Sequence, residues 1–310
     1  MSAAHSGPWG NLRVPFVLPV GRILFTGLSA EQLVSLQSHY PSYVDPIDLA
    51  TGSAEKALEC RAVRLGKALD WPVDALTRDG QYAPHAVVGS DGIELTGLNF
   101  QARVPLYPAR EPGYLGVAEA EELAQPVVME NFLRVFSAHH ALRRGGGVLH
   151  SAGLVLGGQA FLFAGRSGAG KTTLTRKGYE AGAGVLSDDL NLVLPAEDGY
   201  EAHAVPFTGE FGRTLAQVEG PTAYPVAGLI LLERRDGLGV EPVSASAAVA
   251  RLLVACPFVN MEAAVSESLL DAVTGLVAQL PVIGLCCRRE DTFDAIMSAV
   301  TDGLAYARAI

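Results

Sequence analysis

The segment AFLFAGRSGAGKTT, residues 160–173, contains a phosphate-binding loop in the setting that such a loop needs. Gly165, Gly170, Lys171 and Thr172 fit the pattern G-x-x-x-x-G-K-[ST] without a mismatch. An apolar strand precedes the loop and a helix-forming stretch follows it, which indicates a strand–loop–helix unit of an α/β domain. The residues predicted to bind a nucleotide are Gly165, Arg166, Ser167, Gly168, Ala169, Gly170, Lys171, Thr172 and Thr173.

The loop predicts both ATP and Mg²⁺ as cofactors. Its glycines let several backbone N–H groups converge on phosphate oxygens, and the helix that follows adds the positive end of its dipole. We expect Lys171 to bridge the terminal phosphates and Thr172 to offer its hydroxyl to Mg²⁺. The reaction stays open at this point, because ATPases, GTPases, kinases and transporters share the motif.

Two aspartates follow the loop unusually soon. Asp188 and Asp189 lie seventeen and eighteen residues after Lys171, behind a helix that can extend only to about Glu180. The stretch VLSDD then begins a strand, so both carboxylates are expected at its C-terminal end, where α/β sheets bind ligands. Because successive strand side chains point to opposite sides, one can hold Mg²⁺ through water and the other can accept a proton. The alternative is a polar strand end with a helix-capping aspartate.

A histidine is expected near the start of the loop. The apolar runs VLHSAGLVL and AFLFAG flank Gly157-Gly158, which can form a two-residue hairpin turn. Paired residues then have numbers that sum to 315, which puts His150 across from Gly165. From the residues alone, an active-site imidazole and an ordinary core histidine both remain open.

His150, the segment GRSGAGKTT and Asp188-Asp189 resemble the catalytic domain of HPr kinase/phosphorylase, a bacterial enzyme that phosphorylates a serine of a carrier protein. That family has a histidine and two aspartates at the same distances from its loop lysine. The resemblance covers residues 147–194 well and implies an α/β fold, a P-loop kinase domain of the HPr kinase/PEP carboxykinase type. It also implies that His150, Lys171, Asp188 and Asp189 are catalytic residues, with Asp189 as the base, and that the protein forms an assembly larger than a monomer.

The chain departs from the family in ways that bear on its substrate. Thr172-Thr173 stand where the family has Ser-Glu, and the downstream signature that supplies a metal-binding glutamate is missing. Glu210 is the nearest replacement, so the expected metal ligands are Thr172, Asp188 and Glu210, and Arg213 could meet the transferred phosphate. The sequence looks closer to HPr-kinase-related proteins found beside peptide-tailoring genes, some of which phosphorylate a serine of a ribosomally made peptide.

The chain is expected to contain two domains. Residues 1–115 consist of short β-like runs and read as a small β-rich domain, with one helix after Ser29 as N-cap. Residues 116–310 alternate strands and helices and read as the P-loop kinase domain, beginning with a helix over 126–144. The stretch 108–116 is the expected linker, and the adjacent His139 and His140 are expected to pack rather than to bind metal.

Composition excludes several classes of partner. A net charge of −10 without a long basic run argues against nucleic acid. No apolar stretch is long enough to span a membrane and no signal peptide is visible, so we expect a cytoplasmic protein without a membrane partner. The four cysteines lack metal or disulfide spacing and are expected to be buried thiols: Cys60, Cys256, Cys286 and Cys287.

The sequence therefore predicts a Mg-ATP-dependent kinase, an ATP-dependent phosphotransferase whose acceptor is a Ser or Thr hydroxyl of a protein or ribosomally made peptide. Two alternatives remain. The first is a small-molecule kinase of the same fold, which would need a closed pocket with convergent Arg and Lys side chains. The second is a non-catalytic nucleotide-sensing partner protein, against which the histidine and aspartates count.

Overall fold

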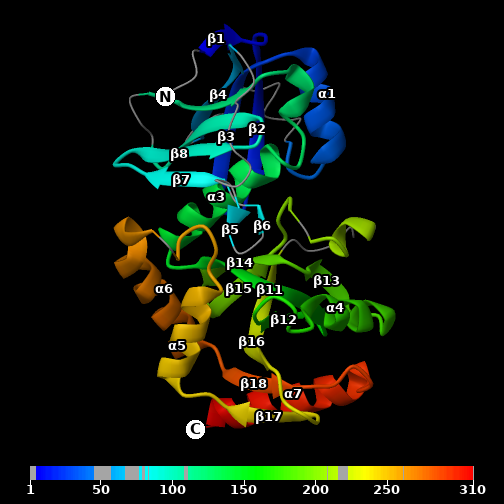
Figure 1. Cartoon of the computed structure of the whole chain (residues 1–310). Helices are drawn as coiled ribbons and strands as arrows, with labels where there is room; N and C mark the ends of the chain where they lie inside the picture. The colour runs from blue at the N-terminus through cyan, green and yellow to red at the C-terminus, as the bar shows by residue number, and fades with distance from the viewer. Residues whose placement is uncertain are drawn as a thin grey trace. The chain divides into compact units, whose positions relative to one another are not determined.

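The computed structural model describes residues 5–44, 57–66, 77–78, 81–82, 84–107, 111–207, 209–215, 223–260 and 262–309 (Figure 1). The chain forms two compact units, Met1–His140 and Ala141–Ile310. The first is rich in strands and the second alternates strands with helices.

One large β-sheet organises the first unit. Among its described residues, eight strands pair in the order β2-β3-β4-β10-β9-β8-β7, with β1 added on β4. These strands are β1 (His5–Pro8), β2 (Leu12–Leu18), β3 (Gly21–Leu28), β4 (Leu58–Leu65), β7 (His85–Val88), β8 (Gly92–Gly97), β9 (Phe100–Pro105) and β10 (Gly113–Val117). A separate hairpin joins β5 (Thr77–Arg78) to β6 (Gln81–Tyr82). The helices are α1 (Ala30–His39), the 3-10 helix η2 (Ala120–Glu122) and α3 (Met129–Leu142).

The expected linker and boundary differ from the structure. Residues 113–117, which the linker was expected to overlap, form β10, which pairs with β4 and β9 inside the sheet. The units divide after His140, whereas a boundary at 115/116 would cut β10. Most of α3 belongs with the sheet because Phe132 packs on Phe25, with ring centroids 5.8 Å apart. Burial of this apolar helix face therefore assigns it to the first unit.

Two local predictions for the first unit are confirmed. The Ser29 hydroxyl accepts the backbone N–H of Gln32 at 3.2 Å, and the Gln32 side chain accepts that of Ser29, which makes a capping box at the start of α1. His140 packs its ring on Phe136 at 4.1 Å, and its Nε2 lies 2.9 Å from the Pro105 carbonyl oxygen. His140 is thus a packed residue.

A second sheet organises the second unit. The described strands pair in the order β12-β11-β14-β15-β16-β18-β17, with β13 on β11, and β12 also pairs with β16. That additional pairing closes β11, β12, β14, β15 and β16 into a ring. The strands are β11 (Gly147–Leu156), β12 (Gln159–Ala164), β13 (Gly184–Ser187), β14 (Leu190–Ala196), β15 (Gly199–His203), β16 (Ala223–Glu233), β17 (Gly239–Pro242) and β18 (Val282–Cys286). Because β12, β16 and β18 are parallel, their C-terminal ends meet at one edge.

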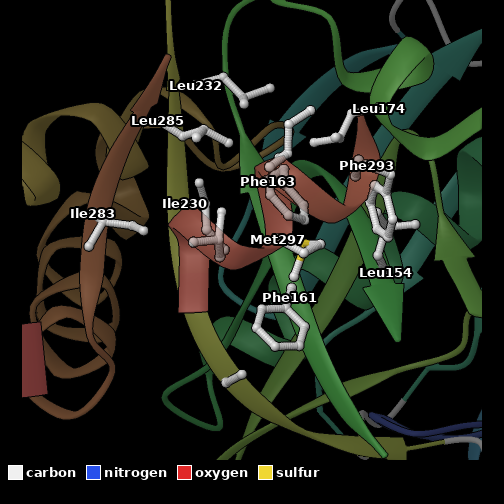
Figure 2. Close-up of a cluster of buried hydrophobic side chains, with 14 of the residues drawn as sticks. Leu154, Phe161, Phe163, Leu174, Ile230, Leu232, Ile283, Leu285, Phe293 and Met297 are labelled. Carbon is white, nitrogen blue, oxygen red and sulfur yellow. The ribbon is translucent and has the colours of Figure 1, made fainter. Parts of the chain in front are cut away.

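The described part of this unit also contains helices, two of which pack on the sheet. The helices are α4 (Lys171–Glu180), α5 (Ala245–Val254), α6 (Ser266–Gln279) and α7 (Phe293–Ala309), with the 3-10 helices η3 (Gly212–Thr214) and η4 (Ala263–Val265). Figure 2 shows Phe163 of β12, Ile230 of β16 and Met297 of α7 meeting in the buried core. Leu174 of α4 joins the same cluster, so the helix that follows the phosphate loop is fixed to the sheet by apolar packing.

The cysteines are free thiols, as expected. Cys60, Cys256 and Cys286 are buried and Cys287 is half-buried. Burial raises the pKa of Cys256 to about 12, which keeps this thiol protonated and unreactive. Among the residues that the structure describes, none of the helices has the length and apolar character needed to cross a membrane.

Candidate active site

The phosphate loop lies between β12 and α4. Gly168 and Gly170 adopt φ values of +72° and +100°, a backbone conformation that favours glycine. Gly165 is also tightly placed, since a Cβ there would lie 3.0 Å from the Ala169 Cβ and 3.1 Å from the Leu232 Cβ. The first turn of α4 leaves N–H groups without intrahelical acceptors, and these groups can bind phosphate oxygens.

Lys171 holds its ammonium group against this loop. The side chain is buried, and Nζ donates to the carbonyl oxygens of Gly165, at 2.7 Å, and Arg166, at 3.3 Å. Burial lowers the pKa of Lys171, and the Asp189 carboxylate opposes that shift. Lys171 therefore lies at the loop and interacts electrostatically with Asp189.

The predicted hairpin register is confirmed. Strands β11 and β12 pair Ser151 with Ala164 and Leu156 with Gln159, so paired numbers sum to 315. Gly157 and Gly158 have φ values of +56° and +75°, which suit a tight two-residue hairpin turn. His150 directly precedes Ser151 in β11. On the opposite edge of β11 it pairs with Leu190 of β14. The sheet thereby brings His150 to the start of the phosphate loop.

His150 and Asp189 form a contact at this position. Nε2 of His150 lies 3.4 Å from Oδ1 of Asp189, and the two side chains are 33% and 35% exposed. The Ser151 N–H donates to the Asp189 carbonyl oxygen at 2.9 Å, which fixes the backbone of the aspartate beside β11. The distance is long for a hydrogen bond. Both groups are open enough for a substrate to reach.

The electrostatic surroundings of His150 disfavour its protonation. Burial lowers the pKa of His150 below 6.5, the positive charge of Lys171 lowers it further, and Asp189 opposes both effects. The imidazole is therefore neutral at pH 7. A neutral ring can donate an N–H to Asp189 without adding a second positive charge beside Lys171.

This arrangement makes a testable prediction for the histidine. We expect the pKa of His150 to lie below 6.5 in the free protein, to rise in Lys171→Met, which removes a like charge, and to fall in Asp189→Asn, which removes an opposite one. NMR titration of the imidazole resonances measures these values, with His150→Gln as the assignment control. A shift of the same sign in both variants would contradict the proposed coupling.

Asp188 faces a different environment from Asp189. Its side chain is buried, and Oδ2 and Oδ1 accept the backbone N–H groups of Phe211 and Gly212, each at 3.1 Å. The two carboxylates therefore have different partners, as expected, but Asp188 and Asp189 lie in the turn after β13, so strand alternation is not the cause. One carboxylate lies beside His150 and the other holds backbone of a distant segment.

Ser187 was not among the residues expected from the sequence, but it shapes the turn that carries both aspartates. Its buried Oγ accepts the N–H groups of Asp189 and Leu190, each at 3.2 Å. Serine commonly makes such bonds to the residues two and three positions later. The order Ser-Asp-Asp was the signal that could have identified this role.

Arg234 also lies at the loop and was not expected there. It follows β16, and its Nη2 donates to the carbonyl oxygen of Gly168 at 2.8 Å. The cause is the parallel pairing of β12 with β16, which ends both strands at one edge. The guanidinium adds positive charge where phosphates are expected. Arginines directly after an apolar strand were the available signal.

The expected metal ligands are only partly brought together. Glu210 is exposed and follows Gly209, which packs against the Asp188 carboxylate, while Thr172 is exposed in the first turn of α4. Among the residues that the structure describes, no three His, Cys, Asp or Glu side chains gather as a metal site. The donors are oxygen atoms, which suit Mg²⁺, an ion that keeps several waters and uses phosphate oxygens.

A family model described as SynChlorMet cassette protein ScmC matches residues 119–299, more than half of the chain. The chain belongs to this family. The ScmC match includes His150, the whole phosphate loop, both aspartates and Arg234, so the candidate site lies inside the region that defines the family. None of the curated proteins matches the chain.

Proposed function

We propose that this ScmC-family chain is a Mg-ATP-dependent kinase of the HPr kinase type that transfers the γ-phosphate to a Ser or Thr hydroxyl of a protein or ribosomally made peptide. The contact between His150 and Asp189, 3.4 Å apart beside the phosphate loop, carries this proposal. A nucleotide sensor needs phosphate contacts but no paired imidazole and carboxylate. The family description names no activity, so the support comes from the geometry and the sequence resemblance.

In this proposal the chain's own residues divide the work of transfer. The N–H groups of residues 165–173 and the Lys171 ammonium bind the β- and γ-phosphates. Asp189 accepts the proton of the attacking hydroxyl as its oxygen forms a bond to the γ-phosphorus and ADP leaves. His150 orients the Asp189 carboxylate. Thr172 and Glu210 would hold Mg²⁺, and the ion would neutralise charge at the phosphate oxygens.

The proposal also covers the cellular location of the protein and the class of its acceptor. Free thiols at all four cysteines suit a reducing compartment, and ATP is an intracellular substrate, so we propose a cytoplasmic location. The net charge of −10 fits a polypeptide acceptor rather than nucleic acid.

Radiolabelled phosphate transfer tests the proposal directly. The purified chain is incubated with Mg²⁺, ATP labelled at the γ-phosphate and a mixture of synthetic peptides that each contain one serine in randomised flanks. We expect label in phosphoserine of the peptides, and loss of this incorporation when EDTA removes Mg²⁺.

Parallel reactions separate the acceptor classes. Free L-serine and glycerol replace the peptides in otherwise identical mixtures. Label in these small alcohols but not in peptides would favour a small-molecule kinase, and nucleotide binding without any transfer would favour a sensor.

A further inference from the structure

Residues 209–215 form a short, turn-rich segment beside the candidate site. The Arg213 N–H donates to the Gly209 carbonyl oxygen at 3.2 Å, and the Thr214 N–H to that of Phe211 at 2.9 Å. The segment includes η3 but adds no strand to the sheet. Its position therefore depends on the side chains that hold it.

Asp188 makes the first attachment. The N–H groups of Phe211 and Gly212 donate to its two carboxylate oxygens, each at 3.1 Å. Hydrogen bonds from backbone N–H groups to a carboxylate are strengthened by its charge. Both carboxylate oxygens of Asp188 are therefore hydrogen-bonded to backbone of the segment.

The packing of Gly209 shows how closely the segment approaches this carboxylate. A Cβ at Gly209 would lie 2.4 Å from Oδ1 and 2.6 Å from Oδ2 of Asp188. An alanine there would displace either the carboxylate or the segment, and each displacement breaks the bonds to Phe211 and Gly212. The contact therefore depends on both residues.

Helix α4 makes the second attachment. The Phe211 ring packs edge-on against Tyr179, with centroids 6.0 Å apart, and the Arg176 guanidinium lies 5.4 Å from its centroid. Since α4 begins at Lys171, the segment is tied to the helix of the phosphate loop as well as to the turn of Asp189. The segment is therefore fixed beside the turn that carries Asp189, and it exposes Glu210 and Arg213.

We propose that Asp188 is a positioning residue that holds segment 209–215 as the wall against which the acceptor polypeptide lies, rather than a ligand of Mg²⁺. The inference rests on the proposed kinase function for the identity of the acceptor. The attachment itself belongs to the free protein. Asp188→Asn removes the charge and turns an acceptor into a donor, whereas Gly209→Ala breaks the same contact with every carboxylate retained.

Hydrogen exchange of the free protein tests the attachment without any activity. In both variants the amides of Phe211 and Gly212 should exchange about tenfold faster or more, and trypsin should cleave faster after Arg213. Gly239→Ala is the matched control, because its Cβ would meet nothing within 4 Å. Unchanged exchange in Gly209→Ala and Asp188→Asn would overturn the proposal.

Kinetics with the single-serine peptide mixture test the acceptor role. Both variants should raise the peptide concentration at half-maximal rate about tenfold, with the affinity for MgATP and the Mg²⁺ dependence within about twofold of the unaltered chain. A higher Mg²⁺ requirement in Asp188→Asn, with Gly209→Ala unaffected, would instead make Asp188 a metal ligand and overturn the proposal. If the unaltered chain transfers no phosphate, the kinase function fails while the exchange result stands.

Discussion

Asp189→Asn should lower the rate of phosphoryl transfer by about 10²- to 10⁴-fold, the usual contribution of a general base, and leave the affinity for MgATP nearly unchanged. Asparagine has the same shape as aspartate but cannot accept the proton of the attacking hydroxyl. Because Asp189 is 35% exposed, the substitution should cost little stability. Single-turnover transfer to the serine peptides and calorimetric titration with MgATP measure the two effects separately.

Asp198→Asn is the matched control for this experiment. Asp198 is exposed in the turn between β14 and β15, so the same chemical change there should alter neither transfer nor binding. Full transfer by Asp189→Asn would assign the base to another group. Equal losses of transfer and of MgATP affinity would make Asp189 a binding residue instead.

The parts of the site that were predictable depend on local geometry. The turn at Gly157-Gly158 fixes the register of β11 and β12 because a two-residue hairpin leaves no freedom in pairing. The short helix α4 likewise returns the chain quickly to the sheet and leaves Asp188 and Asp189 directly after β13. Neighbouring residues alone determine these features.

The parts that were missed depend on partners far away in the sequence. Asp188 is held by Phe211 and Gly212, more than twenty residues later, and no periodicity announces such bonds. The parallel pairing of β12 with β16, which places Arg234 at the loop, likewise joins residues that are far apart in the sequence. Only tertiary structure reveals these contacts.

The prediction of a linker over 108–116 was wrong at β10, because glycine occurs both in flexible linkers and at tightly packed positions of strands. Gly113 and Gly116 resemble linker residues, yet a Cβ at Gly113 would lie 2.5 Å from the Arg103 carbonyl oxygen. A Cβ at Gly116 would lie 2.7 Å from Leu65 Cδ2. These glycines allow close approach of neighbouring groups inside the sheet, which sequence alone does not separate from chain flexibility.

Gly170→Ala should weaken MgADP binding by about 10- to 100-fold, which corresponds to the 1–3 kcal/mol strain of a disfavoured backbone conformation. Gly170 precedes α4 with φ +100° and ψ 9°, and a Cβ there would meet nothing within 4 Å. The penalty therefore arises from the backbone rather than from a clash. It falls on the loop conformation whose N–H groups would bind phosphate, so the bound state bears the cost. Calorimetric titration with MgADP measures it.

Gly199→Ala supplies the control for strain without a role in binding. Gly199 is the first residue of β15 and has φ +109°, and a Cβ there would likewise meet nothing within 4 Å. Gly199→Ala should lower the melting temperature, because it imposes a positive φ on alanine in the folded protein. Only Gly170→Ala should change the Kd for MgADP. Equal Kd values in the two variants would mean that the loop conformation is not required for phosphate binding, and the assignment of residues 165–173 as the nucleotide site would be wrong.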